Sequence, residues 1–252
     1  MIPFERQQKI YKLIEEDKVS TLEELLTYFR EVSESTLRRD LKALEEDEQI
    51  VMQRGGKIRL VESTSFEQPV RAKAVKHVEE KRLIARKAAS LIKNGESVFL
   101  DSGTTVLLML EFLQGKEITV VTTNLMVPQE MQRFPELDKI SCIILGGSLQ
   151  VEAGSTYGTM TNDLLRQYYF DRAFIGISGI SERAGMNTPD EKEAQKKQIA
   201  VRNSRRAYIL ADSSKFGVTT MCKVFEPGEV PVICEKQMDS FLGTGSCIVA
   251  EE

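Results

Sequence analysis

The chain has 252 residues and a net charge of −4, with 41% apolar and 29% charged side chains, a composition typical of a soluble globular protein. No apolar run approaches the roughly 20 residues that a membrane-spanning helix requires. Charged residues also occupy the place of a signal peptide's apolar core. We therefore expect a cytoplasmic protein without a membrane partner, long enough for two ordinary domains.

Four scattered cysteines and a single histidine, His77, argue against the commonest metal and catalytic sites. None of the cysteines forms a C-x-x-C pair, so we interpret them as reduced, buried thiols. One histidine cannot build a His-based zinc site, and His77 lies in a polar stretch that is more typical of a linker than of a catalytic triad. We expect neither a metal ion nor another cofactor.

Helical patterns occupy the first part of the chain. Ile10, Leu13 and Ile14 form the apolar stripe of a first helix. The segment STLEELLTYF starts a second helix, for which Ser20 and Glu23 are the expected capping box. Its leucines and phenylalanine follow at the spacing of one buried helix face.

The third pattern, SESTLRRDLKALE at residues 33–45, gathers cations on one face of a helix. Ser33 is a suitable cap, and the leucines at positions 37, 41 and 44 have the spacing of a buried stripe. The opposite face of this helix would present Ser35, Arg38, Arg39 and Lys42 to solvent.

The segment QIVMQRGGKIRLV predicts a β-hairpin, because two apolar runs flank a Gly55-Gly56 turn. Arg54, Lys57 and Arg59 surround its tip. Three helices followed by a hairpin make a winged helix-turn-helix over residues 1–61, whose third helix enters the major groove while the wing contacts phosphates. The first 62 residues hold more acids than bases, so a small helical interaction domain with a solvated charged face is the alternative. The order of the elements and the cationic hairpin favour DNA.

The segments RQQKIYKLI, VSESTLRRDL and RGGK resemble the N-terminal domain of DeoR-type bacterial transcriptional regulators. In that family a Thr-hydrophobe-Arg-x-Asp-hydrophobe core marks the recognition helix, and residues 36–41 match it. There are two departures from the family pattern. The longer FREVSES turn without glycine bears on the angle of the recognition helix, and Arg54 in place of a histidine adds charge, which favours an altered operator preference over lost binding. The expected DNA-binding residues are Ser35, Thr36, Arg38, Arg39, Lys42, Arg54, Gly55, Gly56, Lys57 and Arg59.

After a polar linker at residues 62–78, short apolar runs alternate with helical stretches over residues 79–252. The expected strands are SVFL, ITVV, ISCIIL, RAFIGI and RAYILA. Alternating strands and helices predict an α/β domain with a mostly parallel sheet.

Small and polar residues follow each expected strand, at the sheet edge where α/β proteins bind ligands. Ser102, Gly103, Thr104 and Thr105 suit a phosphate, because they offer hydroxyls, an accessible backbone and the start of a helix. Lys215 would add a charge. Asn124 would donate to a hydroxyl or phosphate. Each loop alone is also consistent with an ordinary capped turn, and only their convergence favours a binding site.

The segments EKRLIARKAASLIKNGESVFLDSGTT, LGGSL, DRAFIGISGI and ADSSKFG resemble the sensor domain of the same family, which is related in fold to ribose-5-phosphate isomerase. The resemblance implies a phosphorylated sugar as effector, and the stretch TPDEKEAQKK resembles one at the pocket rim. Leu125 and Ser178 depart from the family's pattern at strand ends, where they bear on the ligand rather than on the fold. The implied effector-binding residues are Asp101, Ser102, Gly103, Thr104, Thr105, Asn124, Gly146, Gly147, Asp190, Glu191, Glu193, Lys196 and Lys215.

These features predict a repressor of a carbohydrate-metabolism operon, not an enzyme, whose partners are operator DNA and a phosphorylated sugar. Two half-sites require two recognition helices, so we expect a homo-oligomer, a dimer or a tetramer. One alternative is a sugar-phosphate isomerase or deaminase with an added DNA-binding module, in which one of several carboxylates acts as a general base. Those carboxylates belong to Asp101, Asp190, Glu191, Glu193 and Asp212. Another alternative is a protein–protein scaffold.

Overall fold

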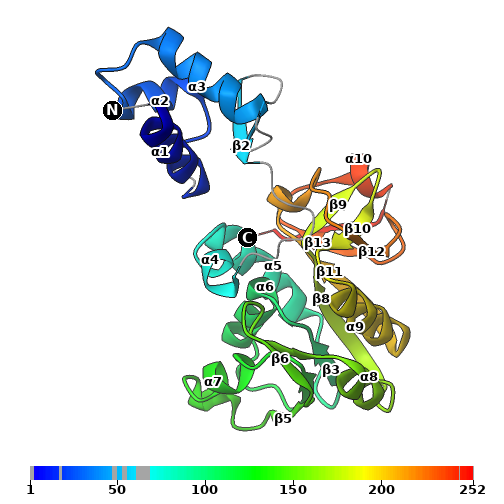
Figure 1. Cartoon of the computed structure of the whole chain (residues 1–252). Coiled ribbons are helices and arrows are strands. Elements are labelled where there is room, and N and C mark those ends of the chain that lie inside the picture. Colours follow the sequence, from blue (N-terminus) through cyan, green and yellow to red (C-terminus); the bar gives the residue numbers. More distant parts are fainter. Residues whose placement is uncertain are drawn as a thin grey trace. The chain divides into compact units, whose positions relative to one another are not determined.

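The computed structural model of the chain describes residues 3–16, 19–46, 50–52, 56–60, 69–243 and 245–251 (Figure 1). The chain divides into two compact units, Met1–Ser63 and Thr64–Glu252, and this division falls inside the linker that we predicted at 62–78. Within the described ranges, no helix combines the length and the apolar character needed to cross a bilayer.

The first unit has the predicted order of three helices and a hairpin. Its elements are α1 (Pro3–Glu15), α2 (Leu22–Tyr28), α3 (Glu34–Glu46), β1 (Ile50–Met52) and β2 (Ile58–Leu60). The predicted apolar stripes of all three helices are buried in one core, which the strands complete with Ile50 and Ile58. The winged helix-turn-helix architecture is therefore confirmed.

The capping box of α2 lies one residue later than we predicted. Thr21, not Ser20, is the N-cap, and its hydroxyl accepts a hydrogen bond from the Glu24 backbone N–H at 3.2 Å. The Glu24 carboxylate in turn accepts from the backbone N–H groups of Thr21 and Ser20. The error arose because a Ser-Thr pair followed by a Glu-Glu pair fits the capping pattern in two registers.

The wing is attached to the helices by its second strand. β1 and β2 pair antiparallel, with Met52 opposite Ile58. The Ile58 backbone N–H donates to the Ser20 carbonyl at 2.7 Å, and Thr21 and Lys57 form an isolated bridge. These bonds connect the wing to the chain just before α2.

The second unit is built on a seven-stranded sheet in which every pairing is parallel, as the sequence predicted. The strand order is β14-β13-β11-β8-β3-β4-β5. The chain order therefore reverses between β3 and β8, which places a topological switch point at their carboxyl ends. The strands are β3 (Ser97–Leu100), β4 (Thr119–Thr122), β5 (Ser141–Ile144), β8 (Phe170–Gly176), β11 (Ser204–Leu210), β13 (Val232–Cys234) and β14 (Cys247–Val249).

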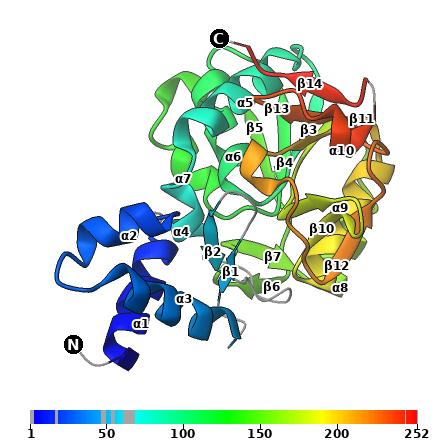
Figure 2. The same cartoon turned by 90° about the horizontal axis from the view of Figure 1, so that it is seen from above.

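Helices cover both faces of this sheet (Figures 1 and 2). Val98 and Leu100 of β3 pack in one core with α5 and α6, whereas Phe99 packs in the other core with α8 and α9. The apolar runs are continuous because both faces of each central strand are buried. The helices are α4 (Val70–Ala74), α5 (Val78–Ser90), α6 (Thr104–Leu108), α7 (Val127–Met131), α8 (Thr159–Leu165), α9 (Glu191–Arg202) and α10 (Asp239–Leu242), with short 3-10 turns η1 (Met109–Phe112), η2 (Pro135–Leu137) and η3 (Ser213–Lys215).

Several smaller elements were not predicted from the sequence. A three-stranded antiparallel sheet has the order β12-β10-β9, and a hairpin pairs β6 with β7. The helix α4 lies inside the predicted linker. The additional strands are β6 (Ser148–Gln150), β7 (Ser155–Tyr157), β9 (Gly179–Ser181), β10 (Gly185–Thr188) and β12 (Cys222–Phe225). The strands β13 and β14 at one edge of the large sheet were not predicted either.

Candidate nucleic-acid interface and ligand pocket

The outer face of α3 presents the side chains that the sequence predicted. Leu37, Leu41 and Leu44 are buried beneath it. The helix starts after Ser33, whose hydroxyl accepts from the Thr36 backbone N–H at 3.3 Å. Thr36 is half-buried, and the exposed members of this face are Ser35, Arg38, Arg39 and Lys42.

The cations of this face differ in their partners. Arg38 pairs with Glu34 at 2.7 Å on the same helix, and Lys42 pairs with Glu46 at 3.6 Å. Arg39 has no ion pair with the part of the chain that the structure describes. Surface pairs of this kind contribute little stability, so Arg38 and Lys42 can exchange their carboxylates for a nucleic-acid phosphate.

The wing adds two exposed cations, Lys57 directly before β2 and Arg59 on it. Gly56 precedes them with a φ of 77°, a left-handed conformation that glycine adopts readily. Arg54 and Gly55, which we also predicted to contact DNA, lie outside the described residues. The first unit thus has cations on α3 and on β2.

Asp40 in the recognition helix has a structural role that the family pattern did not reveal. It is 2% exposed, and its carboxylate accepts from Arg6 Nε and, at 3.1 Å, from Arg6 Nη2. The hydrogen bond to Asp40 raises the pKa of Arg6. The pair joins α1 to α3 and fixes the recognition helix in the unit.

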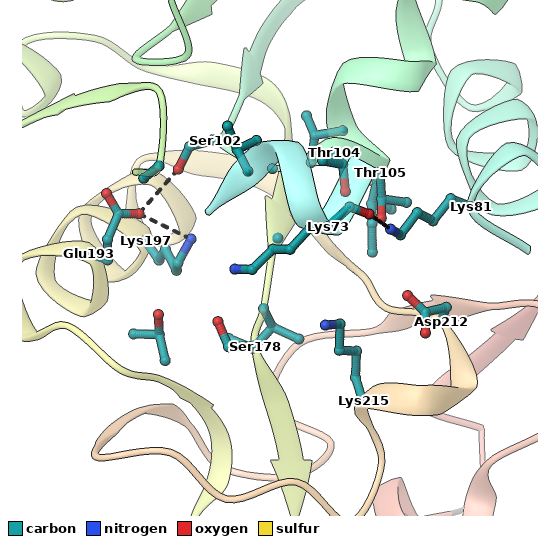
Figure 3. Close-up of a pocket in the computed structure, with 18 residues that line it drawn as sticks. Lys73, Lys81, Ser102, Thr104, Thr105, Ser178, Glu193, Lys197, Asp212 and Lys215 are labelled. Carbon is teal, nitrogen blue, oxygen red and sulfur yellow. Dashed lines mark hydrogen bonds and ion pairs between the residues drawn. The ribbon is translucent and has the colours of Figure 1, made fainter. Parts of the chain in front are cut away.

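A pocket of the second unit opens at the switch point between β3 and β8 (Figure 3). Gly176 ends β8 beside the loop after β3, and a Cβ there would lie 2.9 Å from the Ser102 carbonyl oxygen. Only glycine permits this approach. The lining residues are Val70, Lys73, Lys81, Ser102, Gly103, Thr104, Thr105, Val106, Ala153, Gly176, Ile177, Ser178, Thr188, Glu193, Lys197, Leu210, Asp212 and Lys215.

Of the thirteen predicted effector-binding residues, the structure brings some to this pocket and others to neighbouring structural roles. The lining includes Ser102, Gly103, Thr104, Thr105, Glu193 and Lys215. These come from the loop after β3, from α6, from α9 and from η3. The remaining seven do not line the pocket; they are Asp101, Asn124, Gly146, Gly147, Asp190, Glu191 and Lys196.

Several of those seven have partners that explain their presence without a ligand. The Asn124 side chain accepts from the Met126 backbone N–H at 2.9 Å, and Asp190 caps α9 by accepting from Lys192 and Glu193. A Cβ at Gly147 would overlap the Thr161 hydroxyl at 1.9 Å, so this glycine is required by packing. Gly146 accepts from Thr161 through its carbonyl, and the exposed Glu191 contacts Gln195.

Below the pocket, two carboxylates and two ammonium groups form a buried network. Asp101 accepts from Lys197 at 2.6 Å and from the Gly176 N–H at 3.1 Å. Glu193 accepts from Lys196 at 2.6 Å and lies 3.4 Å from Lys197. Two positive and two negative charges cancel, so this network fixes the floor of the pocket without giving it a net charge.

The pKa shifts follow from this pairing. Burial disfavours the ionised form of Glu193, but Lys196 and Lys197 outweigh burial and hold its pKa well below the usual range. Burial also disfavours the charged form of Lys197, but Asp101 and Glu193 raise its pKa above the ordinary value. Glu193 and Lys197 therefore both stay charged at neutral pH. The Ser102 hydroxyl joins the network by donating to Glu193 at 3.1 Å.

Sequence reasoning did not place four polar residues of the lining at the pocket: Lys73, Lys81, Thr188 and Lys197. It named Ser178, which also lines the pocket, only as a departure from the family pattern. Lys197 follows Glu193 by one helical turn, a spacing that would have placed it on the same face. The stretch that contains Lys73 has no periodic signal. Asp212, which we considered only as a possible general base, also lines the pocket and accepts from the Ser214 N–H at 3.1 Å.

The arrangement suits an anionic ligand that also carries hydroxyl groups. Beyond the neutral floor, the lining contains Lys73, Lys81 and Lys215 and one carboxylate, Asp212, an excess of two positive charges. Hydroxyls of Ser102, Thr104, Thr105, Ser178 and Thr188 surround them. Within the described ranges, no group of three His, Cys, Asp or Glu side chains could hold a metal ion.

Comparisons with known proteins cover nearly the whole chain. Residues 6–63 match the profile of the DeoR-like helix-turn-helix domain, and residues 76–236 match that of the DeoR C terminal sensor domain. The uncharacterized HTH-type transcriptional regulator FruR of Bacillus subtilis is 37% identical over 92% of this chain and 91% of its own. The glycerol-3-phosphate regulon repressor of Escherichia coli is 33% identical over 86% of this chain and 84% of its own.

A further relative is the HTH-type transcriptional repressor GlcR of Bacillus subtilis, which is 33% identical over 91% of this chain and 86% of its own. Among solved structures, ribose 5-phosphate isomerase A of Methanocaldococcus jannaschii matches with a TM-score of 0.40. That match has 18% identity over 56% of this chain and 55% of the other.

Proposed function

Because the chain belongs to the DeoR family of transcriptional regulators, we propose that it represses a carbohydrate-metabolism operon and that a phosphorylated sugar modulates its binding to operator DNA. The observation that supports this most directly is the joint presence of an exposed cationic recognition helix and a lysine- and hydroxyl-lined pocket in one chain.

On the DNA side, we propose that α3 enters the major groove and that the wing contacts phosphates. Arg38 and Arg39 are the candidates for base contacts, since the planar guanidinium can bind guanine with two hydrogen bonds. Lys57 and Arg59 are the candidates for phosphate contacts. Ser35, Thr36 and Lys42 on α3, with Arg54, Gly55 and Gly56 of the wing, complete the proposed interface. Two half-sites require two recognition helices, so we propose a homo-oligomer, either a dimer or a tetramer.

On the ligand side, we propose that the phosphoryl group of a sugar binds among Lys73, Lys81 and Lys215. A phosphate monoester carries about −1.5 to −2 charges at neutral pH, which matches the excess of two positive charges in the lining. The hydroxyls of Ser178 and Thr188 are candidates for contacts with the sugar. The glycerol-3-phosphate regulon repressor, a relative, is named for a phosphorylated metabolite.

Fluorescence anisotropy with DNA from upstream of the protein's own gene tests this proposal, with scrambled DNA as the control. A panel of sugar phosphates is then titrated into the complex. We expect preferential binding of the upstream DNA that one metabolite changes. Equal affinity for both DNAs at every salt concentration would refute the operator assignment, and specific binding insensitive to the whole panel would refute the effector assignment.

Lys215→Ala tests the pocket within the same assay. We expect this variant to bind the operator as the wild type does and to lose its response to the metabolite. Lys139→Ala is the matched control, because Lys139 is exposed, pairs with Glu117 at 2.9 Å and lies outside the pocket. An undiminished response of Lys215→Ala at the same metabolite concentration would remove Lys215 from the site.

We also propose that the protein is not an enzyme. Of the carboxylates considered as a general base, Asp101 and Glu193 are tied into the ionic network, Asp190 caps α9, and Glu191 lies outside the lining. Glu193 and Asp212 are the two of these five that line the pocket, and of the two only Asp212 lies outside the ionic network. Sugar-phosphate isomerisation above background that Asp212→Asn abolishes would overturn this conclusion.

A further inference from the structure

The short helix α4, at the start of the described part of the second unit, forms one wall of the pocket. Val70 and Lys73, both on α4, belong to the lining, and Figure 3 shows Lys73 extending into the same space as Lys215. In sequence, α4 is the first described element after the wing of the DNA-binding unit. A ligand in the pocket therefore touches the segment of the sensor that comes next to the DNA-binding unit along the chain.

The helix α4 has little intrinsic stability. It has five residues, and an isolated helix of that length does not persist in water. Its N-cap, Pro69, provides no side-chain hydrogen bond. Ala72, Ala74 and Val75 are exposed, so the helix buries little apolar surface. Its position must depend on polar contacts with the rest of the unit.

The main polar contact comes from a lysine of the pocket itself. Lys81 on α5 donates through Nζ to the carbonyl oxygens of Lys73 at 2.5 Å and Lys76 at 2.6 Å, at the C-terminal end of α4. Lys81 is 4% exposed and lines the same pocket. At the other end, the Val70 N–H donates to the Glu152 carbonyl at 2.8 Å, beside the lining residue Ala153.

The connection between α4 and α5 is also unusual. His77 has a φ of 51° and a ψ of 44°, and among the described residues it is the only non-glycine residue with a positive φ. A positive φ is uncommon outside glycine, although asparagine, aspartate and histidine adopt it several times more often than other residues. The contacts on either side of His77 therefore help to hold this turn.

The charges of the pocket determine the direction of any response. Lys73, Lys81 and Lys215 belong to the lining and come from three different elements, α4, α5 and η3. A dianion bound among them attracts all three ammonium groups, so it should hold α4 more firmly against α5 and η3.

We infer that α4 is the element through which the occupied pocket acts on the DNA-binding unit: a bound anion contacts Lys73 directly and clamps the helix that Lys81 anchors. This inference rests on the proposed binding of a phosphorylated ligand in the pocket. Lys73 is a ligand contact whose loss uncouples binding from response, and Lys81 is a positioning residue for α4.

Hydrogen–deuterium exchange of the full-length protein, with inorganic phosphate as the probe and chloride at equal ionic strength as the reference, tests the inference. The amides of Ala72, Lys73 and Lys76 donate within α4 and its end, so they report its stability. In the wild type we expect phosphate to slow their exchange by about fivefold or more, the lower end of typical coupling between sites. Phosphate should also change the affinity for operator DNA.

The key comparison is Lys73→Met against Lys76→Met. Both backbone carbonyls accept from Lys81, but only the Lys73 side chain lines the pocket. We expect Lys73→Met still to bind phosphate, which a rise in its melting temperature would show. Phosphate should then neither slow hydrogen exchange in α4 of this variant nor change its affinity for operator DNA. Lys76→Met should respond as the wild type does. An equal response of both variants in exchange and in operator affinity overturns the inference.

Lys81→Met provides a second test, because it keeps the aliphatic stem and removes the donors. We expect rapid exchange in α4 with or without phosphate, and recovery of slow exchange in Lys81→Arg. The control is Lys116→Met, since Lys116 donates to the Ile92 carbonyl at 2.7 Å away from the pocket. Wild-type exchange in Lys81→Met would overturn the anchoring role.

Failure of the inference is distinguishable from failure of the proposed function. If phosphate raises the melting temperature of the wild type and protects the loop at residues 102–105 but leaves α4 unchanged, the anion site stands and the inference is wrong. If phosphate changes neither the melting temperature nor the exchange of that loop, the proposed anion site is wrong, and the inference falls with it.

Discussion

Asp40→Ala tests whether an aspartate of the recognition-helix motif contacts DNA or stabilises the fold. We expect the second, because the Asp40 side chain lies on the buried face of α3 and not on its outer face. Asp40 and Arg6 are 2% and 6% exposed, and their pair joins α3 to α1. Removing one partner of a buried pair leaves a charge without compensation, at a general cost of about 3–5 kcal/mol. Water lies close to both groups in so small a unit, so we expect about 3 kcal/mol, the low end of that range.

This loss is large relative to the total free energy of unfolding that we expect for the first unit. At about 0.05–0.15 kcal/mol per residue, the unit Met1–Ser63 has a free energy of unfolding of about 3–9 kcal/mol. Asp40→Ala therefore removes a third of it or more. Operator binding should fall with the folded fraction of the unit, and the second unit should melt as in the wild type because it has a separate core.

Hydrogen exchange of α1 and α3 in the full chain, combined with operator anisotropy, measures both effects. Glu46→Ala is the matched control on the same helix, since it loses only the exposed pair with Lys42, worth no more than about 0.5 kcal/mol. The double variant Arg6→Met/Asp40→Leu should recover much of the stability, because neither charge is then left alone. If Asp40→Ala weakened operator binding while α1 and α3 kept wild-type protection, Asp40 would be a DNA contact and our reasoning would be wrong.

Three further predictions concern the charged groups of the two sites. Arg39→Ala should weaken specific operator binding by about 1–3 kcal/mol. Glu34→Gln should strengthen it, because this change frees Arg38 from its 2.7 Å ion pair. Fluorescence anisotropy on operator and scrambled DNA measures both effects. Lys57→Ala should weaken binding to all sequences equally and reduce the slope of log affinity against log salt by about 1, if Lys57 contacts one phosphate. Burial lowers the pKa of Lys81 to about 8, with Asp212 opposing and Lys215 reinforcing the shift. A bound phosphate monoester favours the protonated form of Lys81, so affinity should be level between about pH 6, where the phosphate has its second pKa, and about pH 8, and should fall above pH 8. Lys81→Met should abolish this decline in calorimetric titrations.

Apolar periodicity predicted many of the elements that build the three cores, but not β13, which contributes Val232 and Ile233. The stripes of the first unit and the short runs SVFL, ITVV and RAYILA are buried as expected, because burial of apolar surface is what such patterns encode. The three-stranded sheet β12-β10-β9 has no comparable signal. Its segments contain glycines, threonines and short polar runs, and their pairing depends on long-range contacts that a local pattern does not contain.

The pocket was predictable in place but only partly in composition. Strand ends identified the loop at residues 102–105 and Lys215, because parallel strands bring their carboxyl ends to one sheet edge. The same reasoning could not identify Lys73, whose position depends on a five-residue helix in a polar stretch. Nor could it show that Lys196 is fully buried, since EKEAQKKQ has the composition of a solvated helix face.

The floor and the walls of the pocket differ in their charges, and this difference accounts for the two proposed roles of the site: binding an anion and changing the position of α4. On the floor, Lys196 and Lys197 lie on α9 with Glu193, and their charges cancel within the network. The walls have the opposite character, because Lys73, Lys81 and Lys215 belong to α4, α5 and η3 and retain a net charge. A dianion is thus the group that can join these three elements by attraction. In the proposed site, the cation excess that attracts the anion therefore also makes the position of α4 depend on whether the pocket is occupied.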